Sequence, residues 1–118
     1  MNKNIIKILV SMGYRQLKPD IDKWAKPVGY SILTFDYYEP EEEWQITCWC
    51  PVASNSVNDK KKYYRWSTKA IDIDNSDAKE LKDDFLYKEN AVMYTQWNYG
   101  DFSFLTTKDF AEIEMDSY

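Results

Sequence analysis

Two cysteines separated by a single tryptophan, Cys48 and Cys50, are the residues whose type and spacing most directly suggest chemistry. A thiol pair can bind a metal ion, exchange electrons, or pack as two small apolar side chains. If residues 44–53 form a strand, alternation puts both cysteines on its apolar face. Their Cβ atoms are then roughly 6–7 Å apart, beyond disulfide reach. Because zinc needs more ligands and redox pairs usually read Cys-x-x-Cys, we expect core packing and no metal.

Histidine is absent from the 118 residues. This excludes Ser-His-Asp and Cys-His catalysis, the zinc sites built on histidine, and the commonest acid–base catalyst near neutral pH. An enzyme would depend on carboxylates, Lys, Tyr or Cys alone, and a short chain with three glycines leaves little room for a sugar cleft. We therefore expect a protein that is not an enzyme and uses no cofactor.

Residues 72–77, DIDNSD, have the composition of a calcium-binding loop. The EF-hand pattern needs Gly at its sixth position and Glu at its twelfth. Counted from Asp72, these positions hold Asp77 and Asp83, so the pattern fails at both. Acidic residues also stabilise the N-terminus of a helix, and that is the role we expect here.

The net charge of −5 is divided into blocks along the chain. Residues 1–26 carry +4, residues 27–59 carry −6, residues 60–69 carry +5, and residues 70–118 carry −8. An acidic balance works against general affinity for phosphates, because that affinity requires neutralising cations. It suits a protein partner with a basic surface, since complementary potentials steer association.

Acidic runs interleaved with aromatic residues are the candidate partner-binding surface. Acidic runs are usually solvated faces, but exposed aromatics beside them would supply the anchors that dominate interfaces. The candidates are Glu41, Glu42, Glu43, Tyr37, Tyr38, Trp97, Tyr99, Asp109, Glu112 and Asp116.

The basic segment KKKYYRWSTK at residues 60–69 supports an alternative, since bases mixed with aromatics can bind nucleic acid. The residues that would carry this binding are Lys60, Lys61, Lys62, Arg65 and Trp66. Strand alternation would instead place Tyr64 and Trp66 in the core and leave a solvated polar face. The acidity of the rest of the chain makes nucleic acid the less favoured partner.

Hydrophobic periodicity predicts the elements that must position these residues. Residues 2–12 have apolar positions at helical spacing and are followed by Gly13, a residue suited to end a helix. Residues 14–27 contain two prolines and are expected to connect this helix to the sheet, with Ile21 and Trp24 packing down. Strands are expected at residues 28–38, 44–53 and 60–73, joined by turns at residues 39–43 and 54–59.

In the second half, Asp74 to Asp77 should begin a helix with Ala78, Leu81, Phe85 and Leu86 near one face. Strands are then expected at residues 92–100 and 101–105, and Thr106 or Thr107 should cap a terminal helix carrying Phe110 and Ile113. The fold class is α+β in a single domain, residues 1–118. We expect an antiparallel sheet of about four to five strands with an N-terminal, a middle and a short C-terminal helix.

The sequence thus predicts a small acidic binding or inhibitory protein that occupies the surface of a protein partner. By size and charge it is comparable to toxin-immunity and phage anti-defence proteins, and its composition favours a bacterial or phage source. The apolar run at residues 5–10 is short and broken by Lys7, so we expect a cytoplasmic protein with no membrane association. Two alternatives stay open: a nucleic-acid-associated module, and a structural or assembly component that forms homo-oligomers.

Overall fold

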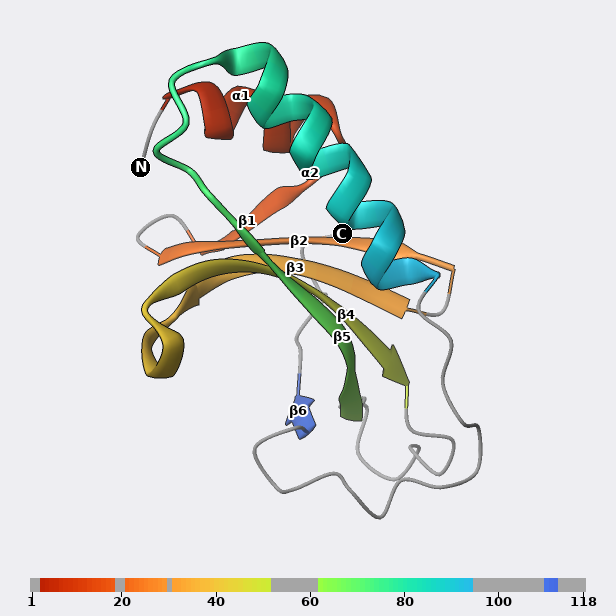
Figure 1. Ribbon diagram of the computed structural model, residues 1–118. Helices are drawn as coiled ribbons and strands as arrows, with labels where there is room; N and C mark the ends of the chain where they lie inside the picture. Colours follow the sequence, from red (N-terminus) through yellow and green to blue (C-terminus); the bar gives the residue numbers. More distant parts are fainter. Residues whose placement is uncertain (1–2, 19–20, 30, 52–61, 95–109, 113–118) are drawn as a thin grey trace.

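The computed structural model describes residues 3–18, 21–29, 31–51, 62–94 and 110–112 (Figure 1). They form two α-helices on one face of an antiparallel sheet in which each strand pairs with the next along the chain. This confirms the α+β class and the antiparallel meander. The elements are α1 (Lys3–Ser11), β1 (Arg15–Lys18), β2 (Ile21–Val28), β3 (Ser31–Tyr38), the 3-10 turn η1 (Glu39–Glu41), β4 (Glu43–Pro51), β5 (Lys62–Ile71), α2 (Ala78–Met93) and β6 (Phe110–Glu112).

Helix α1 ends at the glycine that the sequence indicated. Gly13 has a φ of +91°, which a residue with a side chain rarely adopts. The Tyr14 N–H donates to the Leu9 carbonyl at 2.9 Å and the Gly13 N–H to the Val10 carbonyl at 3.1 Å. These two bonds form a Schellman motif, so the last carbonyls of α1 are satisfied as the chain turns into β1.

The expected connector at residues 14–27 is wrong, because its described residues include the strands β1 and β2, which pair antiparallel. Pro27 suggested an irregular segment, since proline cannot donate to a sheet ladder. The pairing of β1 with β2 extends only to Arg15 opposite Ala25, so Pro27 lies beyond it. Trp24 packs into the core as expected, 8% exposed.

Helix α2 begins as predicted and runs further than predicted. The Asp77 side chain accepts hydrogen bonds from the backbone N–H groups of Lys79 and Glu80 at 3.0 and 3.1 Å, which caps the helix. The expected strand at residues 92–100 is wrong at its start, since α2 continues to Met93. Val92 is buried at helical spacing from Phe85 and Glu89. Because β-branched residues are common in strands, the sequence predicted a strand here instead. Residues 95–109, which include the strand expected at 101–105, lie outside the described residues.

The predicted C-terminal helix is wrong at Phe110, because Phe110–Glu112 form the strand β6. This strand pairs antiparallel with Lys62–Tyr64 of β5. Without it, that end of β5 would present unpaired N–H and C=O groups at the sheet edge. Residues 113–118 are outside the described part.

The main core lies between the helices and the sheet, and it contains one partly buried ionic cluster. Glu89 of α2 accepts a hydrogen bond from the Tyr14 hydroxyl at 2.8 Å. Its carboxylate also forms an ion pair with the Lys26 ammonium at 3.1 Å. The Lys26 ammonium also donates to the Met12 carbonyl at 2.9 Å and lies 4.7 Å from the centre of the Tyr14 ring. The cluster therefore joins α2 to β2 and to the end of α1.

Candidate partner-binding site

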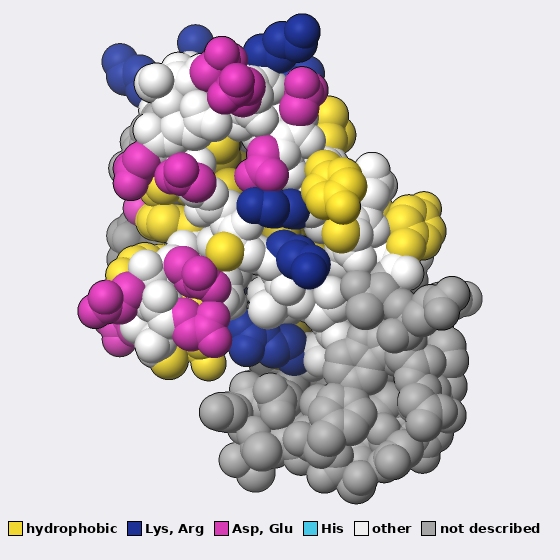
Figure 2. Space-filling model, viewed as in Figure 1, with side chains coloured by type: hydrophobic (Ala, Val, Ile, Leu, Met, Phe, Trp, Pro, Cys, Tyr) yellow, Lys and Arg dark blue, Asp and Glu magenta, His cyan; other side chains and the backbone are white. Residues whose placement is uncertain are grey.

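The turn between β3 and β4 presents four glutamates within five residues, and we call residues 39–43 the acidic tip. Pro40 lies in the 3-10 turn η1, whose last turn is closed by the Glu42 N–H donating to the Glu39 carbonyl at 3.0 Å. Glu42 has a φ of +52°, the one non-glycine residue with positive φ among those described. Figure 2 shows the acidic side chains gathered at this end of the sheet.

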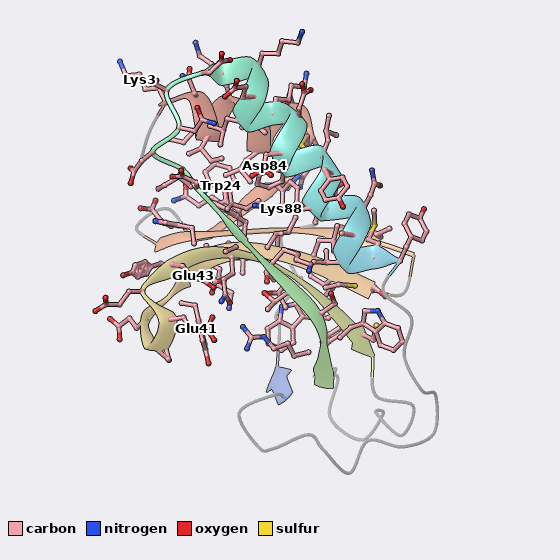
Figure 3. The ribbon with its side chains drawn as sticks, viewed as in Figure 1. Lys3, Trp24, Glu41, Glu43, Asp84 and Lys88 are labelled. Atoms are coloured by element: carbon pink, nitrogen blue, oxygen red, sulfur yellow. The ribbon has the colours of Figure 1, made fainter. Side chains whose placement is uncertain are left out.

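A buried glutamine, Gln45, forms hydrogen bonds with the acidic tip. The Gln45 amide Nε2 donates to a Glu41 carboxylate oxygen at 3.1 Å and to a Glu43 carboxylate oxygen at 2.8 Å. Glu41 and Glu43 lie beside the turn, at the end of the sheet (Figure 3). Since Gln45 is 2% exposed, one fixed amide orients two of the four carboxylates.

The other end of the Gln45 amide is held from β5. Its Oε1 accepts a hydrogen bond from the Arg65 guanidinium at 2.8 Å, and a longer one from the Thr68 hydroxyl at 3.4 Å. Arg65 also lies over the Tyr38 ring, 4.7 Å from its centre, on the face of the sheet away from the helices. Arg65 and Tyr38 thus support the tip from the neighbouring strands.

Asp36 lies next to Gln45 in this network, because the two residues pair across β3 and β4. Its carboxylate is 3.9 Å from the Lys23 ammonium. Burial raises the pKa of Asp36, and the Lys23 and Arg65 charges only partly counteract this effect. The charged form of the carboxylate is therefore less stable here than in water.

On the helix side of the sheet, a row of aromatic rings links the core to the tip. Tyr37 meets Trp44 edge-on with ring centres 5.7 Å apart, and Trp44 stacks on Phe35 at 5.4 Å. Phe35 in turn contacts Phe85 of α2 at 5.4 Å. Tyr37 is 42% exposed, so the row ends in an aromatic side chain at the surface.

The described lining of a surface hollow beside the tip consists of Tyr37, Glu39 and Glu42. The three ion pairs within the described residues are Lys23–Asp36, Lys26–Glu89 and Lys88–Asp84, and none includes a tip glutamate. The site thus combines an anchored aromatic with carboxylates that have no cationic partner in the described part. Such a surface can bind a cationic side chain.

The structure brings together half of the predicted partner-binding residues. Glu41, Glu42, Glu43, Tyr37 and Tyr38 lie at the tip, although Tyr38 lies under Arg65 on the opposite face from Tyr37. The remaining candidates are Trp97, Tyr99, Asp109 and Asp116, which lie outside the described residues, and Glu112, whose side chain is also outside them.

Two of the residues proposed to bind nucleic acid, Arg65 and Trp66, have structural contacts within the fold. A bulge between β4 and β5 sets Cys48 opposite Ser67 but Trp49 opposite Arg65, so Trp66 is the extra residue. Trp66 consequently turns into the core and is 4% exposed, as expected, while Arg65 bonds Gln45. Tyr63 of the same segment is also buried. Lys60 and Lys61, and the side chain of Lys62, are outside the described part.

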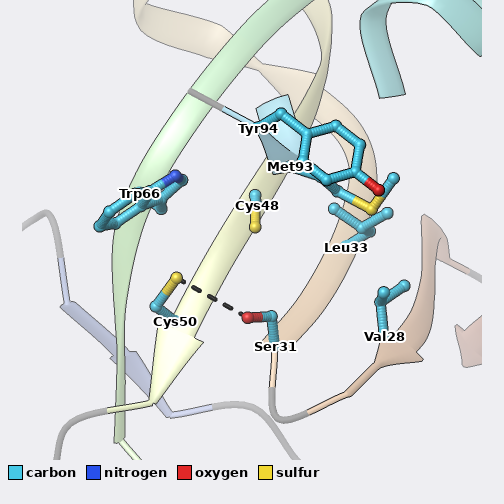
Figure 4. Close-up of a pocket in the computed structure, with 8 residues that line it drawn as sticks. All are labelled: Val28, Ser31, Leu33, Cys48, Cys50, Trp66, Met93 and Tyr94. Carbon is cyan, nitrogen blue, oxygen red and sulfur yellow. Dashed lines mark hydrogen bonds between the residues drawn. The ribbon is translucent and has the colours of Figure 1, made fainter. Parts of the chain in front are cut away.

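The two cysteines share the helix-side face of β4, as alternation predicted (Figure 4). Cys48 is buried and Cys50 is half-buried, with the Ser31 hydroxyl 3.7 Å from the Cys50 sulfur. A hydrogen bond with the Cys50 thiol and burial both raise the pKa of Cys48 far above its usual value. Both side chains line a pocket of about 290 Å³ between the sheet and the end of α2.

Sequence reasoning missed Gln45 and Met93. Alternation placed Gln45 on the polar face of its strand, where a glutamine is expected to be exposed to solvent. Met93 was assigned to a strand, so its place beside the cysteines could not be foreseen. A helical pattern extended through Leu81, Phe85, Glu89 and Val92 would have placed it there.

Comparisons with protein-family models, curated proteins and solved structures gave no match for the chain. In the part of the chain that the structure describes, no three His, Cys, Asp or Glu side chains come together as a metal site. None of the described helices is long and apolar enough to cross a bilayer. The site must therefore be interpreted from its own geometry.

Proposed function

We propose that this chain is a small non-enzymatic binding protein that occupies a basic surface of a protein partner through its acidic tip. The observation that carries the proposal is the fixed arrangement of the tip: Gln45 holds Glu41 and Glu43, and Arg65 holds Gln45. A rigid surface binds with less loss of conformational entropy than a flexible one. The carboxylates would speed the encounter with a basic partner.

Tyr37 supplies the anchor in this proposal. Tyrosines at the centre of an interface are frequent hot spots, because they bury a large area and lose few rotamers. Tyr37 lines the hollow together with Glu39 and Glu42, and Trp44 contacts its ring edge-on. A Lys or Arg side chain of the partner would contact the Tyr37 ring and one of these carboxylates. Covering a basic functional surface in this way would inhibit the partner.

The test compares charge reversal at the tip with the same reversal elsewhere. Glu39→Lys with Glu42→Lys removes the two tip glutamates that Gln45 does not hold. Asp22→Lys with Asp83→Lys changes two exposed acidic residues away from the tip. Each reversal adds two units of charge, so both double variants carry −1 instead of −5.

Each tagged protein is used to capture partners at low and moderate salt, and the bound material is identified as protein or nucleic acid. We expect one protein with a basic surface to bind the wild type and the control variant, and to be lost with the tip variant. Equal capture by both variants would show that net charge, or another surface, is responsible. Capture that disappears after nuclease treatment would favour nucleic acid instead.

Self-association is a second candidate, favoured by two exposed tyrosines, one on α2 and one directly after its last residue. Tyr87 and Tyr94 are seven residues apart in the sequence and are 73% and 77% exposed. Large exposed aromatics are uncommon on a monomer unless they contact something. Sedimentation velocity at several concentrations tests this: a larger species that forms with concentration, and is lost with Tyr87→Ser and Tyr94→Ser, would support it. A constant monomer would reject it.

A further inference from the structure

Three sulfur atoms line the pocket at the end of α2 (Figure 4). Cys48 and Cys50 contribute thiols from β4, and Met93 contributes a thioether from the last residue of α2. The other described lining residues are Val28, Ser31, Leu33, Trp66 and Tyr94. Two distant parts of the sequence therefore bring soft donor atoms to one cavity.

Hard ligands are missing from the described lining of this pocket. It has no carboxylate, amide or amine side chain, and its side-chain oxygens are the hydroxyls of Ser31 and Tyr94. The bulge on β5 contributes to this, since it turns Trp66 toward the pocket and leaves Arg65 on the opposite face. Magnesium and calcium, which require several oxygen ligands, have no suitable donors here.

We propose that this pocket binds Cu(I), with the sulfurs of Cys48 and Cys50 as ligands and the thioether of Met93 as a third. Thiolate and thioether ligands select soft ions such as Cu(I). Structural zinc sites, by contrast, almost always have four ligands. Cu(I) replaces the proton of each thiol that binds it, and no electron is transferred.

The spacing of the two cysteines suits such an ion. Metal–sulfur bonds of about 2.3 Å place two ligating sulfurs within about 4.6 Å of each other. Cβ atoms two residues apart on a strand are roughly 6–7 Å apart, and the thiols can turn toward each other. Both cysteines line the same pocket, so the two sulfurs can approach one ion from the same side. The ion can enter because Cys50 is half-buried and Tyr94, beside the pocket, is exposed.

The test titrates the reduced, oxygen-free protein with Cu(I) in competition with a coloured Cu(I) chelator. We expect one equivalent to be retained by the wild type and none by the Cys48→Ala, Cys50→Ala double variant. Met93→Leu keeps an apolar side chain of similar volume and removes only the thioether. Met12→Leu is the matched control, since Met12 packs on the same core and does not line the pocket. Thermal unfolding checks that each variant is folded.

We expect Met93→Leu to weaken Cu(I) binding by about 10- to 100-fold, the range typical of losing a group that supports a metal site. Met12→Leu should leave the affinity unchanged. If the Met93→Leu and Met12→Leu variants bind Cu(I) with equal affinity, the Met93 thioether is not a ligand and the three-sulfur site is wrong. If the wild type retains no more Cu(I) than the double cysteine variant, or binds Zn²⁺ as well as Cu(I), the proposal is also wrong. Neither result bears on the acidic tip, which lies at the opposite end of β4.

Discussion

Replacing Gln45 with glutamate tests how firmly the acidic tip is held. Gln45→Glu keeps an acceptor for the Arg65 guanidinium and the Thr68 hydroxyl. It removes the amide N–H groups that hold Glu41 and Glu43, and it adds a third carboxylate between them. The shape of the side chain is nearly unchanged, so the effect comes from the lost donor and the added charge and not from packing.

The cost can be worked out from the two lost hydrogen bonds. Bonds to charged groups contribute about 1.5–3 kcal/mol each when buried. Glu41 is exposed and Glu43 half-buried, so water replaces part of each, and we assign about 1 kcal/mol per bond. Repulsion among the three carboxylates is offset by the attraction between the new carboxylate and the Arg65 guanidinium, which lies 2.8 Å from the Gln45 oxygen. The total of about 2 kcal/mol corresponds to a fall in Tm of roughly 8 °C for a domain of this length.

Thermal unfolding followed by circular dichroism at pH 7 and near pH 4 measures this effect. Toward pH 4 the introduced carboxyl takes up a proton and can donate again, so the difference from wild type should shrink. Lys82→Gln is the control, because it changes net charge by the same amount at an exposed position of α2. A Tm within 2 °C of wild type at pH 7, or an equal loss at both pH values, would refute the role of the Gln45 amide.

Three further predictions concern the ionic and thiol groups. Glu89→Gln leaves Lys26 without its counter-charge, and we expect a loss of about 2–4 kcal/mol in denaturant unfolding, somewhat less than for a fully buried pair. Burial raises the pKa of Asp36 in the folded protein above the value of 3.8 expected for the unfolded chain. Above the raised pKa the charged carboxylate therefore opposes folding, and this destabilisation decreases as the pH falls toward 3.8. Asp36→Asn should therefore raise the Tm at pH 7 and lose this advantage near pH 3. A thiol reagent should label Cys50 of the native protein first, and Cys48 only at the rate of opening.

Each of these predictions has a control or a contrary outcome. Asp84→Asn breaks the surface pair with Lys88 and should cost only about 0.3–0.5 kcal/mol, so an equal loss with Glu89→Gln would contradict a special role for the buried pair. A lower Tm for Asp36→Asn at pH 7 would mean that the pairing with Lys23 outweighs burial. Simultaneous labelling of both thiols would contradict the burial of Cys48.

The sequence was most informative where one local pattern agreed with burial. Gly13 marked the end of α1, and Asp77 marked the start of α2, because each residue has a backbone role that few others can fill. Alternation placed Cys48 on the core face of β4 without knowledge of its neighbours. The acidic tip was also recognised, as a charged turn between two strands.

Features that depend on pairing partners were not predictable from local pattern. The hairpin of β1 and β2 was missed because Pro27 suggested an irregular segment. In the structure Pro27 lies beyond the last β1–β2 pair and pairs with Ile32 on the β3 side. The strand at Phe110–Glu112 exists because β5 pairs with it, and its own three residues give no such signal. The bulge that separates Arg65 from Trp66 decides which of the two supports the tip, and it depends on the register of β4 against β5.

The most direct test of the central claim is capture of a protein partner by the wild type, by Glu39→Lys with Glu42→Lys, and by the control Asp22→Lys with Asp83→Lys. If the acidic tip binds a basic surface, the wild type and the control recover the same protein at low salt. The tip variant recovers none, and the wild-type yield falls as salt rises. Equal recovery by all three proteins would contradict the account and place the binding surface elsewhere on the chain.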